Sequence, residues 1–176
     1  MGLLDNLGSF LGQRDGDFIR LEDSADCFGP GPAILLFGCP EGISDEELSD
    51  MIEDGAPNAG NVLMQRIDAA SPLFDLTVSE ALEKVVREGT CSSGVGADGA
   101  VKHSCPVPVL YFSGFPGKEM MATYRIIASE IYAETGGTAN AACAKAVPPA
   151  MKKPLRQVIE EITGDHEDAT GMSNEQ

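Results

Sequence analysis

Apolar and polar residues alternate at two different spacings along the chain, and the change of spacing is clearest around Val109–Phe112. This block is short, continuous and rich in β-branched and aromatic residues, with Pro108 before it and Ser113-Gly114 after it, so it predicts a strand buried on both faces. From about Lys118 to Glu134 the apolar residues recur every three or four positions, which predicts an amphipathic helix ended by Gly136-Gly137. A buried strand followed directly by such a helix is half of a βαβ unit.

The first half of the chain shows the same alternation. Ala33–Phe37 predicts another fully buried strand. Ser44 and Glu47 have the spacing of a capping box, so a helix is expected to begin there and to end at Gly55. Val62–Ile67 is only partly apolar and therefore predicts a strand nearer an edge of the sheet.

Three further elements complete the pattern. Thr77 and Glu80 form a second capping box and predict a second helix. Ala141–Val147 predicts a fourth strand, and Pro154 suits the first turn of a last helix that Gly164 is expected to stop.

These elements predict an α/β fold of two βαβα halves that form one mainly parallel sheet with helices packed on it. We expect a flexible N-terminal arm and linker at 1–31, an α/β domain at 32–164 with halves 32–89 and 106–164, and a disordered acidic tail at 165–176. The halves align at an offset of roughly 74 to 77 residues, which favours an internal duplication. The two fully apolar strands are expected to be neighbours in the sheet.

Charge and cysteine content exclude several classes of protein. The 176 residues include 28 acidic and 12 basic ones, for a net charge of −16, which argues against nucleic-acid binding because phosphate contacts need clustered Lys and Arg. No apolar run approaches the roughly 18–20 residues that span a bilayer. Five cysteines without a CxxC pair leave a free thiol and favour a reducing compartment.

Three segments suggest ligand sites but lack the required pattern. Gly114–Lys118 joins a strand to a helix, yet its spacing is not that of a P-loop, so we interpret it as a turn. Gly29–Pro32 precedes a strand and therefore fails the context of a dinucleotide fingerprint. Cys91, His103 and Cys105 could contribute metal ligands, but they lack the paired spacing of zinc sites. We expect neither a metal nor a cofactor.

The thiols and the acidic helix face admit two interpretations each. Cys39 follows the first strand and, like Cys143, could serve a small enzyme, but neither His103 nor His166 is placed in sequence to activate it, so buried or partly buried thiols are expected. The acidic residues at 45–54 could bind a cation or a basic partner, and a solvated helix face is the commoner explanation.

Two groups of residues suggest docking on another protein. One is an apolar face on a short N-terminal helix, formed by Leu4, Leu7, Phe10 and Leu11. The other is a basic cluster beside Pro148-Pro149, formed by Lys145, Lys152, Lys153 and Arg156. A helix this short needs a surface to lie on, and the cluster is unusual in so acidic a chain. We expect Leu4, Leu7, Phe10, Leu11, Lys152, Lys153 and Arg156 to contact a partner.

Two resemblances extend this interpretation. The second half opens with PVLYFSGF at Pro108–Phe115 and closes with KPLRQVIEEI at Lys153–Ile162, and in these it resembles a family of small bacterial α/β proteins of unknown function. It departs from them by a longer middle helix and a loop containing two glycines. The whole chain also resembles plastid proteins of algae with secondary plastids, such as diatom-type peripheral photosystem I subunits.

The second resemblance implies a chloroplast protein on the stromal side of the thylakoid, with photosystem I core subunits as partners. We therefore expect a non-enzymatic accessory subunit that docks on a larger protein assembly. The alternatives are a small thiol- or cofactor-dependent enzyme that uses Cys39 or Cys143, and a free-standing regulatory or ligand-binding domain.

Overall fold

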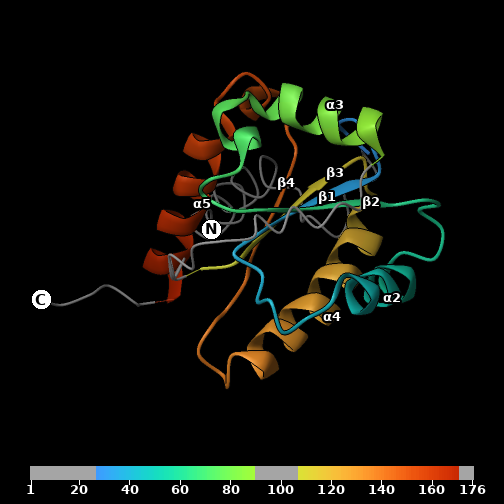
Figure 1. The fold of residues 1–176 in the computed structure, drawn as a ribbon, viewed down its shortest axis with the longest axis vertical. Coiled ribbons are helices and arrows are strands. Elements are labelled where there is room, and N and C mark those ends of the chain that lie inside the picture. Colours follow the sequence, from blue (N-terminus) through green and yellow to red (C-terminus); the bar gives the residue numbers. More distant parts are fainter. Residues whose placement is uncertain (1–26, 90–106, 171–176) are drawn as a thin grey trace, which may run out of the picture.

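A four-stranded mixed sheet, with two helices on each face, forms the centre of the protein (Figure 1). The computed structural model describes residues 27–89 and 107–170. Its regular elements in chain order are β1 (Ala33–Phe37), α2 (Asp45–Gly55), β2 (Leu63–Ile67), the 3₁₀ turn η2 (Pro72–Asp75), α3 (Val78–Glu88), β3 (Val109–Ser113), α4 (Gly117–Glu134), β4 (Ala142–Lys145), the 3₁₀ turn η3 (Pro148–Ala150) and α5 (Leu155–Thr170). The predicted α/β fold is confirmed. The predictions for Leu4, Leu7, Phe10, Leu11, Cys91, His103 and Cys105 lie outside the described residues.

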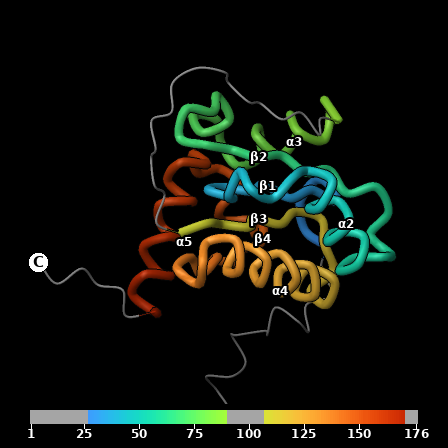
Figure 2. The backbone as a smooth tube through the Cα atoms, turned by 60° about the horizontal axis from the view of Figure 1, so that its bottom comes forward, coloured from blue at the N-terminus to red at the C-terminus, as the bar shows by residue number. Residues whose placement is uncertain are grey.

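The strands lie in the order β2-β1-β3-β4 (Figure 2). β1 runs parallel to β2, and β3 runs parallel to β4, because α2 and α4 supply the crossover that parallel neighbours require. β1 and β3 meet antiparallel at the centre. The sequence predicted the two parallel pairs, each of which lies within one half of the chain. It did not predict the antiparallel pair, because the apolar pattern of one half carries no information about the strand direction in the other half.

β1 and β3 are buried at all of their residues, as predicted for neighbouring central strands. Their side chains alternate between two cores. Ile34 and Leu36 pack under α2 and α4, whereas Leu35 and Phe37 pack under α3 and α5. A strand covered on both faces needs apolar residues at every position, which explains the unbroken apolar runs.

The two halves are related by an internal two-fold symmetry. Leu35 of β1 lies opposite Tyr111 of β3 at the centre of their register. The strands are followed by Gly38 and Gly114, whose φ angles of 65° and 71° turn the chain toward the next helix in the same way. Both pairs are 76 positions apart.

A reciprocal pair of backbone hydrogen bonds repeats this symmetry on the face of α3 and α5. The N–H of Val78 donates to the carbonyl of Lys153 (3.0 Å), and the N–H of Leu155 donates to the carbonyl of Leu76 (2.8 Å). Val78 and Leu155 are 77 positions apart, and so are Leu76 and Lys153. Each of the two bonds is therefore the counterpart of the other in the opposite half. The arrangement therefore supports the internal repeat that the sequence predicted.

Both predicted capping boxes are present. The N–H of Glu47 donates to Ser44 Oγ (3.2 Å), and the N–H of Ser44 donates to Glu47 Oε2 (2.8 Å). Thr77 and Glu80 form the same pair of bonds at the start of α3. These hydrogen bonds lower the pKa of both glutamates, because they favour the ionised carboxylate.

The predicted end of the last helix is wrong. α5 continues through Gly164 to Thr170, so 165–170 is helical instead of forming part of a disordered tail. His166 Nε2 lies 3.1 Å from the carbonyl oxygen of Asn140 and attaches this extension to the loop before β4. A single glycine inside a helix costs only about 1 kcal/mol, which such contacts can offset.

Two glycine substitutions should have opposite effects on stability. A Cβ at Gly55 would lie 2.5 Å from the Cα of Thr123, so Gly55→Ala forces α2 and α4 apart and should cost about 1–3 kcal/mol. A Cβ at Gly164 would meet nothing within 4 Å, so Gly164→Ala should stabilise α5 by about 0.5–1 kcal/mol. Urea unfolding at a constant m-value measures both effects, and a Gly55→Ala variant as stable as the parent would contradict the close helix contact.

Candidate functional site

Arg66 joins the edge strand β2 to the loop at the carboxyl end of β1. Its Nε donates to Asp45 Oδ1 (2.7 Å), and its terminal nitrogens donate to the carbonyls of Pro40 (3.1 Å) and Ile43. These bonds fix the entry into α2 from three sides. Arg66 therefore has a structural role at the carboxyl end of β1. Cys39 follows β1 at this same edge of the sheet, which is where a thiol enzyme would place its nucleophile.

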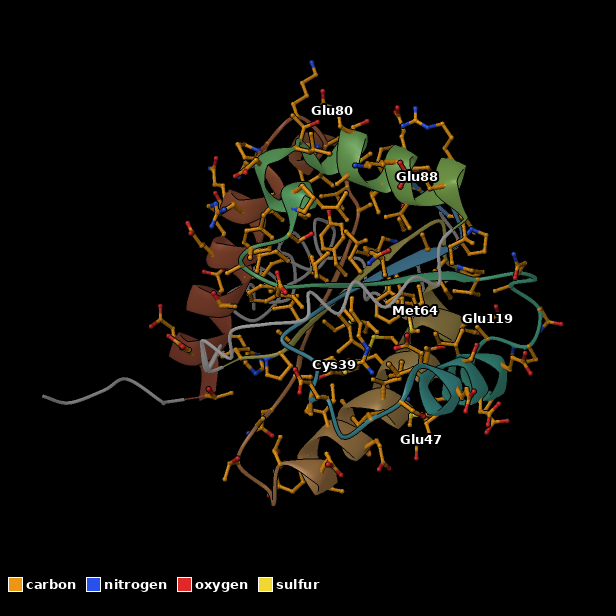
Figure 3. All side chains as sticks on the ribbon, in the orientation of Figure 1. Cys39, Glu47, Met64, Glu80, Glu88 and Glu119 are labelled. Carbon is orange, nitrogen blue, oxygen red and sulfur yellow. The ribbon has the colours of Figure 1, made fainter. Side chains whose placement is uncertain are left out.

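The two candidate thiols are held in the protonated form. Cys39 lies toward the interior, whereas Glu47 and Glu80 lie on the outside of their helices (Figure 3). Burial raises the pKa of the Cys39 thiol, and the Arg66 guanidinium offsets only part of this. Burial raises the pKa of Cys143 to about 12. Because the thiolate is the nucleophile, neither environment activates cysteine chemistry, and His166 contacts the Asn140 carbonyl instead of a thiol.

Alkylation should distinguish this arrangement from a reactive cysteine. We expect iodoacetamide at pH 7 to modify Cys39 and Cys143 more slowly in the folded chain than after unfolding, because both thiols are partly buried and their pKa values are raised. Site-resolved mass spectrometry measures both rates, with the exposed Cys27 as the internal reference. Rapid labelling of Cys39 in the folded chain, at a rate that rises well below the ordinary thiol pKa, would contradict the account.

Acidic neighbours neutralise much of the predicted basic cluster. Lys153 forms an ion pair with Glu161 (2.8 Å), and Arg156 forms one with Asp75 (3.2 Å). The Arg156 guanidinium also lies over the ring of Phe74, 4.8 Å from its centre. The role of these residues in partner binding stays a prediction, but carboxylates of the chain itself partly neutralise the positive charges of Lys153 and Arg156.

The acidic face of α2 is exposed. Its solvent-facing carboxylates belong to Glu46, Glu47, Asp50, Glu53 and Asp54. Within residues 27–89 and 107–170, no three His, Cys, Asp or Glu side chains are grouped to hold a metal ion. None of the helices in those two ranges combines the length and the apolar character needed to cross a membrane.

A shallow depression of about 430 Å³ lies on the flank of α4. This α4 depression is lined by Tyr124, Arg125, Ala128, Ser129, Tyr132 and Asn140. Tyr124 is partly buried and donates its hydroxyl to the carbonyl of Ala141 (2.8 Å), whereas Tyr132 is 49% exposed. The feature was not foreseen, although its signal is in the sequence: tyrosine, alanine and tyrosine recur four residues apart on one side of the helix.

The second half has longer helices than the first. α4 has 18 residues and its counterpart α2 has 11, and at the 76-position offset of the two halves the residues of α4 without an equivalent in α2 are 117–120 and 132–134. α5 has 16 residues and α3 has 11, and the contact of His166 with Asn140 lies in this second extension. Of the residues of α4 that line the depression, Tyr132 lies beyond the part that α2 matches, whereas Tyr124 and Ala128 lie within it.

Comparison with known proteins gives no family assignment: no protein-family model, curated protein or solved structure matches the chain.

Proposed function

We propose that the protein is a non-enzymatic accessory subunit that docks on a larger protein assembly, and that the α4 depression is its docking surface. The observation that carries the proposal is an exposed Tyr132 beside Tyr124 and Arg125 on one helix flank. Tyr and Arg are enriched among the residues that dominate binding energy at protein interfaces. A shallow surface suits a protein partner, since sites for small molecules enclose most of the ligand.

Two further observations support this function over the alternatives. Tyr132 lies in the last turn of α4, which has no equivalent in α2, as expected for an exposed side chain added for a partner. The raised pKa values of Cys39 and Cys143 oppose the thiol enzyme, because both groups are protonated at neutral pH.

Photosystem I is the assembly that we propose to test first. Its support is the resemblance of the sequence to diatom-type peripheral photosystem I subunits, which implies docking on core subunits at the stromal side of the thylakoid in a chloroplast. The residues Lys152, Lys153 and Arg156 remain proposed secondary contacts in such a complex.

Native electrophoresis of an extract from the source cells, probed for this chain, tests the function. The proposal predicts that the chain migrates with a complex many times larger than its own 18.5 kDa, and that the band coincides with photosystem I if that assembly is the partner. A large band elsewhere would reject photosystem I alone. Migration at the mass of the free chain would reject the accessory-subunit function.

A further inference from the structure

We infer that Glu119 and Thr123 of α4, together with the carbonyl end of α2, bind a calcium ion between the two helices. The inference goes beyond the proposed docking function and does not depend on it. Its first basis is a pair of oxygen atoms. Within the described residues, Glu119 Oε2 and Thr123 Oγ1 are buried and have no hydrogen-bond partner. Because they belong to residues four positions apart on one helix, they lie on the same side of α4.

These two oxygen atoms need a partner that the chain itself does not provide. A buried oxygen atom without a hydrogen bond destabilises a fold, so such atoms are usually satisfied by another group. Thr123 is 0% exposed, whereas Glu119 is only partly buried. Glu119 therefore leaves a path from the solvent to the two oxygen atoms, which an ion site requires.

The Glu119 carboxylate has no capping role at the start of α4. The glutamates at the third position of α2 and α3, Glu47 and Glu80, each accept a hydrogen bond from the N–H of their N-cap residue. Glu119 holds the same position in α4, but its N-cap residue is Pro116, which has no N–H. All three glutamates are labelled in Figure 3. The third differs from the other two because its carboxylate is left for another positively charged or donating group.

The carbonyl end of α2 meets α4 at Thr123. Gly55 is the last residue of α2, and a Cβ there would lie 2.5 Å from both the Cα and the Oγ1 of Thr123. The last carbonyl of α2 with an intrahelical donor is that of Ile52, because Pro57 lacks the N–H that the following carbonyl would need. The carbonyls at 53–55 follow it at the negative end of the helix dipole, where the last turn of α2 contains no basic residue.

The chemistry of these groups selects a hard cation. A carboxylate, a hydroxyl and backbone carbonyls are all oxygen ligands, which calcium accepts in a flexible geometry, whereas magnesium requires a near-ideal octahedron. A cation at this position also complements the negative end of α2 in a chain whose net charge is −16. The set contains one carboxylate, so we expect a dissociation constant of about 10⁻⁴–10⁻³ M. It follows no sequence motif, which is why the sequence predicted no metal.

Urea unfolding of the full chain, with calcium or with EDTA, tests the site. Calcium should raise the unfolding midpoint of the parent, because a ligand that binds only the folded state stabilises it. The rise should disappear in Glu119→Gln and persist in the matched control Glu130→Gln, which neutralises an exposed carboxylate of the same helix. Equal rises in the two variants would mean that surface carboxylates bind the ion, and they would overturn the inference. An unchanged midpoint of the parent, or a larger rise with magnesium, would overturn it as well.

Thr123→Val tests the hydroxyl ligand separately. Valine keeps the branched shape that packs against Gly55 but lacks the hydroxyl. In EDTA this variant should be at least as stable as the parent, because an apolar group replaces a buried hydroxyl that has no hydrogen bond. Its dissociation constant for calcium, measured by titration calorimetry, should rise by about ten-fold. A dissociation constant equal to that of the parent would overturn the assignment of Thr123 as a ligand.

Discussion

Replacing Leu110 with alanine should lower the free energy of unfolding by about 2–5 kcal/mol. Leu110 is the second residue of the central strand β3, is 1% exposed, and stands between Leu36 of β1 and Cys143 of β4. The side chain packs into the core under α2 and α4. Its truncation removes buried apolar surface and leaves a cavity that the neighbouring strands cannot close without losing their register.

The control for this experiment is Val147→Ala, which truncates an apolar residue of the second half that is 39% exposed. That variant should stay within about 0.5 kcal/mol of the parent. Chemical unfolding followed by circular dichroism compares the three chains. A Leu110→Ala variant as stable as the control would mean that the Leu110 side chain is not buried in a core. It would contradict the description of β3 as a strand covered by helices on both faces.

Replacing Tyr132 with alanine should abolish most of the docking while the fold is unaffected. Tyr132 contributes an exposed aromatic ring to the α4 depression, and truncation of such a residue at the centre of an interface typically costs 2 kcal/mol or more, or about a thirty-fold rise in Kd. Because the ring is half exposed, its loss removes little core packing. The fraction of tagged chain that remains in the native complex measures the effect.

Val147→Ala again serves as the matched control, since it removes an exposed apolar side chain away from the α4 depression. It should be retained like the parent. Equal retention of Tyr132→Ala and the parent would place the docking surface elsewhere. The next surfaces to test would then be the predicted contact at Leu4, Leu7, Phe10 and Leu11, which lies outside the described residues, and the one at Lys152, Lys153 and Arg156.

The features that the sequence predicted well are those determined by neighbours in the chain. The capping boxes at Ser44 and Thr77 depend on groups three residues apart, so their pattern identifies the helix starts directly. The apolar blocks Ala33–Phe37 and Val109–Phe112 were confirmed as neighbouring buried strands, because only a position covered on both faces demands apolar residues throughout.

The features that the sequence did not predict depend on contacts between distant residues. No local pattern specifies whether β1 and β3 meet parallel or antiparallel, because that direction is set by how the two halves pack. The continuation of α5 past Gly164 depends on the contact between His166 and Asn140, 26 residues apart. A glycine predicts a helix end only where tertiary contacts do not outweigh its propensity.

The candidate surface was missed for a related reason. Tyr124 and Ala128 fit the apolar periodicity that predicts α4, and this pattern alone assigns them to the buried side of the helix. Both pack at the margin of the core and are only partly buried, and Tyr132 is exposed. Periodicity gives the side of a helix but not whether a neighbouring element covers it.

Hydroxyl-radical footprinting of the native complex tests the central claim most directly. The reactivity of Tyr132 is compared between the complex and the isolated chain, with Phe28, 37% exposed and outside the α4 depression, as the reference. The account predicts that Tyr132 is strongly protected in the complex while Phe28 reacts equally in both states. Equal reactivity of Tyr132 in both states would contradict the account.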